Sequence, residues 1–299
     1  SSSSIPPPFK RHDRRWREDC PHIAFIRCLG HTQHMKPESP IKAVAIDLDG
    51  TLLTTDKKIT PLTLAVLQAV MDRGVHVAIA TGRSLATSIR FTDQVGTTFP
   101  MICYNGSCIW DPVTGNDLMH IRLSHEICTD IVTISRETHT HLHAFMDHDL
   151  LFTESGRHAD HLEPLSAVIG KAVEFEKLPD LHFTKAMFIG EADETERLRQ
   201  LLVERHGTVL HLVYSHHDYF EIMTGGATKG TALQTLMGNH GIRREEVMAF
   251  GDADNDIEML SWAGRGYAME NSSDQVKSYA YGVAGHNDAD GVAKKLIEV

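Results

Sequence analysis

The stretch KAVAIDLDGT, residues 42–51, joins a short apolar run to two closely spaced aspartates. A short β-branched run of this kind is typical of a strand that is buried on both faces of a parallel sheet. Asp47 and Asp49 follow it two residues apart, so both carboxylates can point into one crevice at the strand end. Such a pair is unstable unless a cation or a shared proton relieves the repulsion. The stretch therefore predicts a Mg²⁺ site, although an isolated DxDG sequence can also be an ordinary turn or helix cap.

On both sides of this stretch the sequence alternates between strand and helix patterns. Further buried strands are expected at 75–80, 100–105, 247–250 and 265–269. The helices between and after them are expected at 60–73, 84–95, 229–239, 255–262, 273–279 and 289–297. Strand–helix–strand repeats imply right-handed crossovers and an open sheet. The predicted fold class is therefore α/β, with a Rossmann-like parallel sheet.

The section from 123 to 222 has a different rhythm, in which helices alternate with pairs of adjacent strands. Helices are expected at 124–138, 156–169 and 192–206, and strands at 142–147, 150–154, 173–176, 183–190, 208–214 and 218–223. This pattern predicts an α+β insert with a largely antiparallel sheet. The expected organisation is a core of residues 41–122 and 223–299, interrupted by an inserted domain at 123–222.

The first 34 residues open with SSSSIPPPFK and carry six Lys or Arg against three Asp or Glu, so they are +3 and the remainder is −14. A Ser-, Pro- and Arg-rich leader without apolar periodicity is expected to be disordered, which makes residues 1–40 a tail ahead of the core. Its acidic residues disfavour a transit peptide. We interpret it as upstream sequence before a natural start at Met35.

Composition excludes several classes of protein. The net charge of −11 disfavours nucleic-acid binding, which needs basic surface. We found no apolar run that approaches the roughly 20 residues needed to cross a bilayer. The five cysteines are odd in number and form no CxxC pair, which suits a reducing compartment without disulfides or a thiolate zinc site. A cytoplasmic protein, monomeric or a small homo-oligomer, is expected to bind neither nucleic acid nor membrane.

Thr81-Gly82-Arg83 directly follows the expected strand at 75–80. A hydroxyl and free backbone amides beside a helix start can hold phosphate oxygens, although Thr also caps many ordinary helices. Arg83 could hold a phosphate or another substrate anion, or it could be a solvated surface charge. The three residues by themselves leave both possibilities open.

Two further segments carry candidate groups. Lys229, at the start of a helix, could offset charge on a transferring phosphoryl group, although such a lysine is more often at the surface. The segment GDADND, residues 251–256, places three acids at a strand end, which again calls for a cation. An EF-hand calcium loop is excluded, because its sixth position would be Ile257 where glycine is required.

Together the segments DLDGT, TGR, TKG and GDADND, in this order at strand or helix ends, resemble the motifs of haloacid-dehalogenase-superfamily phosphatases. The segment GDADNDIEML at 251–260 is especially similar to the Cof-type, sugar-phosphatase-like branch with a C2 cap, and the resemblance covers residues 41–299. It implies a Rossmann-like core, a cap at 123–222 that acts as a substrate lid, and Mg²⁺-dependent hydrolysis of a small phosphorylated metabolite through an aspartyl-phosphate.

The resemblance also implies a role for each matching residue. Asp47 would be the nucleophile and a Mg²⁺ ligand, and Asp49 the general acid/base that binds Mg²⁺ through its backbone carbonyl. Asp252 would complete the metal ligands, and Asp256 would position the metal shell and Lys229. The remaining matches would hold the phosphoryl group or substrate: Thr81 and Lys229, with Leu48, Gly82, Arg83, Asn105, Gly106 and Asn255. Gly225–Thr228 departs from the usual pattern, which puts only the local loop shape in doubt.

The substrate and the final acceptor are less determined than the chemistry. Sugar phosphates are the preferred class of substrate, followed by pyridoxal phosphate, flavin mononucleotide and nucleoside monophosphates. A phosphomutase of the phosphomannomutase type would return the phosphoryl group to its substrate, and a non-catalytic phosphometabolite-binding protein would only retain the fold. The intact Asp47 and Asp49 pair argues against the binding protein.

The insert is rich in histidine, including His139, His141, His143 and His148. The first three share parity on an expected strand, so a zinc site is conceivable there. No nearby cysteine completes such a set, and the chain has 20 histidines in all. Ordinary surface or half-buried histidines are the preferred interpretation.

Overall fold

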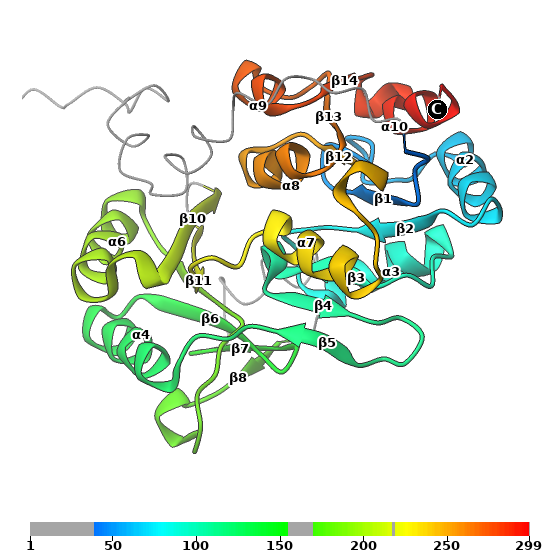
Figure 1. Ribbon diagram of the computed structural model, residues 1–299. Helices are drawn as coiled ribbons and strands as arrows, with labels where there is room; N and C mark the ends of the chain where they lie inside the picture. Colours follow the sequence, from blue (N-terminus) through cyan, green and yellow to red (C-terminus); the bar gives the residue numbers. More distant parts are fainter. Residues whose placement is uncertain (1–38, 155–169, 217–218, 299) are drawn as a thin grey trace, which may run out of the picture. The chain divides into compact units, whose positions relative to one another are not determined.

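The computed structural model describes residues 39–154, 170–216 and 219–298 (Figure 1). Its five-stranded sheet has the order β14-β13-β12-β1-β2, and every neighbouring pair is parallel. The strands are β1 (Ala43–Ile46), β2 (His76–Ile79), β12 (Val247–Gly251), β13 (Arg265–Met269) and β14 (Gly282–Ala284). The register pairs Ala43 with Val247, so strands about 200 residues apart in the sequence are direct neighbours. The predicted α/β class with a parallel sheet is confirmed.

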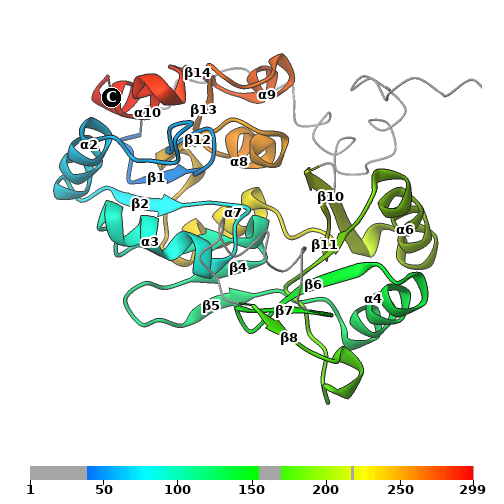
Figure 2. The same cartoon turned by 180° about the vertical axis from the view of Figure 1, so that it is seen from behind.

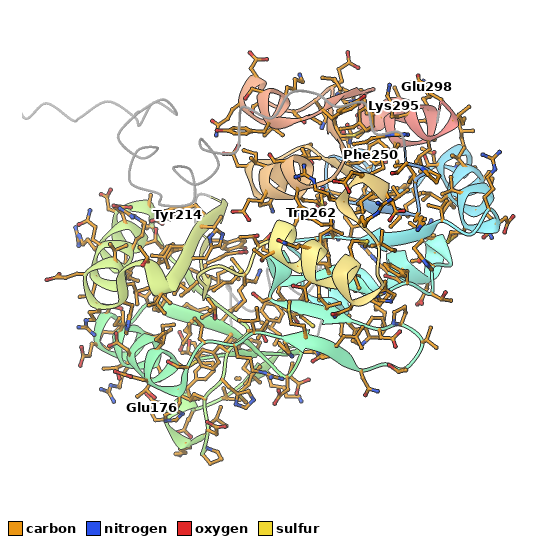
Figure 3. All side chains as sticks on the ribbon, in the orientation of Figure 1. Glu176, Tyr214, Phe250, Trp262, Lys295 and Glu298 are labelled. Atoms are coloured by element: carbon orange, nitrogen blue, oxygen red, sulfur yellow. The ribbon has the colours of Figure 1, made fainter. Side chains whose placement is uncertain are left out.

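Helices connect these strands as the sequence predicts. They are α2 (Pro61–Asp72), α3 (Leu85–Val95), α7 (Lys229–Asn239), α8 (Ile257–Trp262), α9 (Asp274–Tyr279) and α10 (Gly291–Ile297). Thr60 caps α2 by accepting a hydrogen bond from the Thr63 N–H, and Pro61 occupies the first turn, where its missing N–H costs nothing. Side chains fill the space between sheet and helices, and Phe250 on β12 is fully buried while Glu298 is exposed (Figure 3).

A second, three-stranded antiparallel sheet corrects the prediction for residues 100–120. The expected strand at 100–105 is only β3 (Met101–Cys103), and it pairs with β4 (Cys108–Trp110), which in turn pairs with β5 (Asp117–His120). β3 pairs with the chain just after β2 through one parallel bridge, between Ile102 and Ala80. The chain reverses direction after β3 through residues with positive φ. It therefore forms a hairpin of β3 and β4 in place of a longer parallel strand. The strands β4 and β5 were not predicted, because they are short and show no clear alternation.

The insert forms a six-stranded sheet with the order β10-β11-β9-β6-β7-β8. Its strands are β6 (His141–Met146), β7 (Asp149–Phe152), β8 (Lys171–Ala172), β9 (Lys185–Ile189), β10 (Leu210–His216) and β11 (Tyr219–Thr224). Every pair is antiparallel except β7 with β8. Asp147 and His148 both have positive φ, which suits the tight turn between β6 and β7.

One face of this sheet packs against α4 (His125–Thr138) and α6 (Ala192–His206), which lie on the same side of it (Figures 1 and 2). Leu142, Phe188 and Phe220 are fully buried in this apolar layer. Because residues alternate along a strand, Phe145, Lys185 and Met223 belong to the opposite face. Phe145, Leu150 and Phe152 on this opposite face belong to the apolar cluster of the parallel sheet.

Other boundaries differ in smaller ways. The strand expected at 173–176 is a 3₁₀ turn, Phe175–Lys177, in which Phe175 is buried edge-on against Phe183. Burying this ring decides the local conformation. The strand β14 was not predicted, because three residues carry no periodicity. The helix expected at 156–169 and the tail up to residue 38 lie outside the described residues. Among the described residues, no helix has the length and apolarity to cross a bilayer.

Candidate active site

The predicted motifs meet at one edge of the parallel sheet. Asp47 follows β1, Thr81 follows β2 and Asp252 follows β12, and these three strands are neighbours. Carboxyl ends of adjacent parallel strands share one edge, so the sheet order itself gathers these residues. Lys229 joins them from the first turn of α7, where Thr228 forms a capping box with Thr231.

Lys229 is the buried cation of this site. Its Nζ lies 2.7 Å from Asp47 Oδ1 and 2.7 Å from Asp256 Oδ1, and its side chain is 1% exposed. Burial by itself would lower the pKa of Lys229, but the two carboxylates outweigh it and raise the pKa, so the ammonium stays charged. The second oxygen of Asp256 accepts the N–H groups of Asp252 and Ala253 at 3.0 and 3.1 Å. Asp256 thereby ties the loop after β12 to Lys229.

Three carboxylates converge beside Lys229. One oxygen each from Asp47, Asp252 and Asp256 lies within 4.8 Å of the others. Burial, together with repulsion from Asp256, raises the pKa of Asp47 to about 8 and that of Asp252 to about 6, although Lys229 opposes both shifts. Thr51 Oγ1 also donates a hydrogen bond to Asp252 Oδ1 at 3.0 Å. Unrelieved repulsion among oxygen ligands is the arrangement that a hard divalent cation such as Mg²⁺ relieves.

Gly50 allows this convergence. Its φ is +80°, and a Cβ at this position would lie 2.3 Å from Asp252 Oδ2. Any side chain here would push away a carboxylate of the candidate metal site, and it would also be strained in the left-handed region. The glycine of the DLDGT segment is therefore required by the site as well as by the turn.

Asp49 has partners that the sequence did not reveal. Arg83 contacts it through Nε to Oδ2 at 2.6 Å and Nη2 to Oδ1 at 2.6 Å, and Lys57 Nζ lies 2.7 Å from Oδ1. Burial would raise the pKa of Asp49, but the hydrogen bonds from Arg83 and Lys57 prevail and lower it to about 2. Arg83 is therefore neither a plain surface charge nor free for a phosphate in this state. Asp49 can act as an acid only after these cations move.

The turn after β3 packs against both the TGR segment and α7. Asn105 accepts a hydrogen bond from Asn255 Nδ2 at 2.8 Å, and its own amide reaches Met223 Sδ on β11 at 3.9 Å. A Cβ on Gly82 would lie 2.7 Å from Asn105 Oδ1, and one on Gly106 would lie 2.1 Å from the Thr228 carbonyl oxygen. The predicted residues Gly82, Asn105, Gly106 and Asn255 are thus brought together.

Two predicted residues face inward. Thr81 is buried, and its Oγ1 accepts the Arg83 N–H at 3.1 Å. The Leu48 side chain is fully buried in the core, so only its backbone can face a phosphate. Asn271 was missed: its Nδ2 donates to the Gly50 carbonyl at 2.8 Å and so supports the DLDGT loop. An isolated asparagine 221 positions away gives no signal in the sequence.

Comparisons with known proteins place this chain among described relatives. A family model described as haloacid dehalogenase-like hydrolase matches residues 44–296. The chain is 32% identical over 266 residues to the 5-amino-6-(5-phospho-D-ribitylamino)uracil phosphatase YitU of Bacillus subtilis, covering 85% of this chain and 96% of the relative. It is 32% identical over 261 residues to an HMP-PP phosphatase of Serratia proteamaculans, covering 85% and 94%.

A solved structure shows the same fold. A crystal structure of a Thermotoga maritima protein superposes with a TM-score of 0.81 at 27% identity, covering 87% of this chain and 97% of that one. The family model spans most of the described chain and includes every motif of the candidate site. The resemblance noted in the sequence is therefore confirmed, and the chain belongs to the haloacid dehalogenase-like hydrolases.

Proposed function

We propose that this protein is a Mg²⁺-dependent phosphomonoester hydrolase that acts on a small phosphorylated metabolite through an aspartyl-phosphate. The observation that carries the proposal is the buried group of Asp47, Asp252 and Asp256 around Lys229 at the carboxyl edge of the sheet. A carboxylate with this surrounding charge can attack phosphorus, because the developing negative charge on the phosphoryl oxygens meets fixed cations. The relatives named as phosphatases support the same chemistry.

Mg²⁺ bound by Asp47, Asp252 and the Asp49 carbonyl would supply positive charge that favours ionised Asp47 and neutralises phosphoryl oxygens. The Asp47 carboxylate then attacks phosphorus, and the bond from phosphorus to the leaving oxygen breaks. Asp49 donates a proton to that oxygen. Asp49 next takes a proton from water, the resulting hydroxide attacks phosphorus, and Asp47 leaves as a carboxylate. Lys229 stabilises the transferring group from the side throughout.

Arg83 and Lys57, which contact the Asp49 carboxylate, must move before Asp49 can donate a proton. A carboxyl whose pKa is about 2 holds no proton to donate, so Arg83 and Lys57 must first release it. A substrate phosphate offers Arg83 a competing anion, to which a guanidinium can bind through two hydrogen bonds. We infer that substrate binding draws Arg83 from Asp49 and thereby raises the pKa of the general acid.

We place the core at 41–122 and 223–299 and the cap at 123–222. The face of the six-stranded sheet opposite α4 and α6 supplies the groups that we expect to meet the leaving group. It carries Lys185 and Glu221, a buried pair at 2.9 Å, and Phe145, whose ring contacts the Tyr104 ring at 5.5 Å. Tyr104 immediately precedes Asn105 of the site. A lid formed by this face would exclude water during formation of the acyl-phosphate.

This face and the relatives narrow the range of candidate substrates. A buried Lys and Glu beside an aromatic ring suit a leaving group that has both hydrogen-bonding and apolar parts. Sugar phosphates remain the leading class from the sequence. The relatives are named for a phosphorylated ribitylaminouracil and for HMP-PP, so heterocyclic phosphates belong in the same test.

The test is phosphate release from sugar phosphates, pyridoxal phosphate, flavin mononucleotide, nucleotides and the two compounds named above, with and without Mg²⁺. Asp47→Asn removes the attacking carboxylate at nearly constant size and should abolish turnover. Magnesium-dependent release that is lost in this variant supports the proposal. Release that continues in excess chelator, or a variant that keeps half of the rate, contradicts the mechanism. Isomerised sugar phosphate without free phosphate would instead indicate a mutase.

A further inference from the structure

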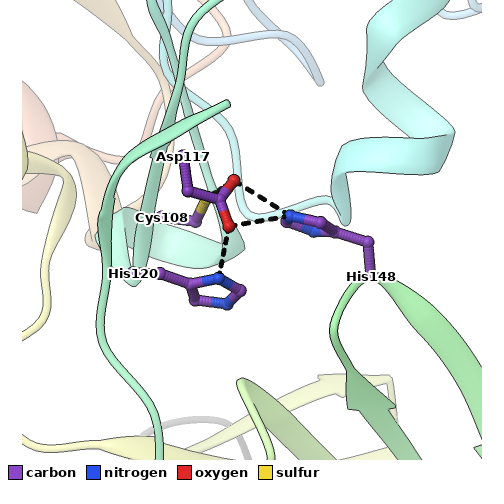
Figure 4. A group of neighbouring side chains, drawn as sticks. All are labelled: Cys108, Asp117, His120 and His148. Carbon is purple, nitrogen blue, oxygen red and sulfur yellow. Dashed lines mark hydrogen bonds and ion pairs between the residues drawn. The ribbon is translucent and has the colours of Figure 1, made fainter. Parts of the chain in front are cut away.

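A second cluster of metal-ligating side chains lies outside the Asp47 centre. It joins Cys108 on β4, Asp117 and His120 on β5, and His148 in the turn between β6 and β7 (Figure 4). One ligand atom of each lies within 4.8 Å of the others. This cluster could not be predicted from the sequence, because the four positions match no metal-binding spacing and the cysteine lies 40 residues before the last histidine. The folded chain supplies the cysteine that the histidine-rich insert lacked.

Three donors converge on the Asp117 carboxylate. His120 Nδ1 lies 2.6 Å from Oδ2, His148 Nε2 lies 3.0 Å from Oδ1, and Cys108 Sγ donates to Oδ1 at 3.3 Å (Figure 4). The ring planes of His120 and His148 are stacked at 5.0 Å between centroids. A thiol and two imidazole nitrogens thus face the same carboxylate.

A strand irregularity makes this convergence possible. Cys108 and His120 are direct cross-strand partners, so they point to the same face of the sheet. Asp117 is three residues before His120 and would face the other side of a regular strand. The register shifts between Ile109 and Trp110, so that Leu118 is the extra residue of β5. Such a bulge re-aims a side chain, and here it turns Asp117 toward His120.

The second ring nitrogen of each histidine contacts a hydroxyl group. His120 uses its other nitrogen, Nε2, to contact Thr184 Oγ1 at 2.6 Å, and His148 Nδ1 lies 3.4 Å from the Tyr104 hydroxyl. Histidines that bind metals commonly present one ring nitrogen to the ion while a hydrogen bond holds the other. Both rings are therefore oriented with Nδ1 of His120 and Nε2 of His148 directed into the cluster.

We propose that Cys108, Asp117, His120 and His148 form a zinc site. One sulfur, two nitrogens and one oxygen are a tetrahedral donor set for Zn²⁺, whereas the all-oxygen Asp47 centre suits Mg²⁺. Cys108 is fully buried and the His120 side chain is 4% exposed, while Asp117 and His148 are 22% and 25% exposed, which leaves an entry path. On binding, the Cys108 thiol loses its proton to solvent and both imidazoles bind in neutral form.

Four protein ligands leave no open position, so this zinc is structural. It would fasten the β3–β4–β5 sheet to the turn of the inserted sheet. His148 also contacts Tyr104, which precedes Asn105 of the candidate active site. The ion would therefore fix the position of Tyr104, and with it the turn that carries Asn105, without contacting the substrate. This proposal stands independently of the proposed hydrolase reaction.

The competing interpretation is a metal-free hydrogen-bonded cluster centred on Asp117. Titration of the metal-free protein with Co²⁺ separates the two, because only a thiolate ligand gives a sulfur-to-cobalt charge-transfer band. We expect this band, with one equivalent of Co²⁺ saturating it and Zn²⁺ removing it. Cys108→Ser should abolish the band, while Cys128→Ser, which removes another buried cysteine, and Asp47→Asn should retain it. A wild-type protein without the band, or a Cys108→Ser variant that keeps it, overturns the proposal.

His148→Gln provides a second test that does not alter a buried residue. We expect it to weaken Zn²⁺ binding by at least about tenfold and to reduce the rise in Tm that Zn²⁺ causes. The matched control is His206→Gln, which removes a histidine bound to Asp130 on other elements of the insert. Circular dichroism establishes that both variants fold. Equal Zn²⁺ affinity in wild type and His148→Gln would show that the cluster holds no zinc.

Discussion

Lys229 is the charge on which two buried acids depend. It lies 2.7 Å from both Asp47 and Asp256, and all three side chains are at most 6% exposed. Removing one partner of a buried ionic network leaves uncompensated charge in a medium of low polarity. The residue therefore serves stability as well as the proposed chemistry.

Lys229→Met should lower the free energy of unfolding of the metal-free protein by about 3–5 kcal/mol at neutral pH, measured by urea denaturation. The loss should shrink as the pH falls below 8, because burial raises the pKa of Asp47 to about 8 and its protonation removes the repulsion between Asp47 and Asp256. Lys57→Met is the control, since Lys57 is 55% exposed and its ion pair with Asp49 contributes less than about 1 kcal/mol. Equal destabilisation by both substitutions would contradict the assigned role of Lys229.

The acids themselves make metal binding depend on pH. A protonated carboxyl does not bind Mg²⁺, so each ligand whose pKa lies above the solution pH must release a proton. Burial raises the pKa of Asp47 to about 8 and that of Asp252 to about 6. Between pH 8 and 6 one proton leaves per ion, and below pH 6 two leave.

We therefore expect the apparent Kd for Mg²⁺ to rise about tenfold per pH unit between pH 8 and 6, and more steeply below pH 6. Calorimetric titrations in buffers of different ionisation enthalpy measure both the Kd and the protons released. Asp252→Asn should bind more weakly and lose the steeper portion below pH 6. An affinity that does not change with pH would refute the contribution of these carboxyls.

At the scale of elements, the turn after β3 sets the position of α7. Gly106 has a φ of +104°, and a Cβ there would lie 2.1 Å from the Thr228 carbonyl oxygen. That oxygen belongs to the N-cap residue of the helix that carries Lys229. The contact allows little adjustment, because both partners are backbone.

Gly106→Ala should reduce the free energy of unfolding by at least about 2 kcal/mol and lower kcat, because strain at positive φ adds to a displaced α7. Gly96→Ala is the matched control: its φ is +73°, but no atom lies within 4 Å of the added Cβ. This control should lose only about 1–2 kcal/mol and keep its kcat. Urea denaturation and steady-state kinetics measure the two effects. Unchanged kcat in Gly106→Ala would separate this turn from the site.

At the scale of the whole molecule, the candidate active site is built from distant parts of the chain. Its proposed ligands and donors begin at Asp47 and end at Asp256, and they are gathered by strand order in one parallel sheet. The apolar cluster of the five-stranded sheet extends to Phe145, Leu150 and Phe152 on one face of the six-stranded sheet, and a second cluster lies on the other face.

Deleting residues 1–34 should leave kcat, KM and the Mg²⁺ requirement unchanged. Steady-state kinetics on the full chain and the shortened chain, with the same substrate, provide the comparison. A shortened protein that folds, as circular dichroism would show, but loses most of its activity would assign the tail a part in the site. We expect the two proteins to be indistinguishable in kinetics.

The sequence by itself determined the parallel sheet and most of the candidate site. Asp47, Thr81 and Asp252 each follow a recognisable buried strand, and parallel strands must bring their carboxyl ends to one edge. Helix boundaries such as Thr60-Pro61 were also predictable, because caps are local. These features depend on residues within a few positions of one another, so pattern and propensity reveal them.

Only the tertiary structure decided how distant side chains pair. Arg83 binds Asp49 across 34 positions, and Asn271 supports Gly50 across 221. The strands β4, β5 and β14 are three or four residues long and are stabilised by neighbouring strands. They are therefore too short to show the alternation of apolar and polar residues that predicts a strand. The bulge at Leu118 turns Asp117 toward His120, and the turn at His148 completes that cluster from another sheet. Such contacts arise from chain topology, which local sequence does not encode.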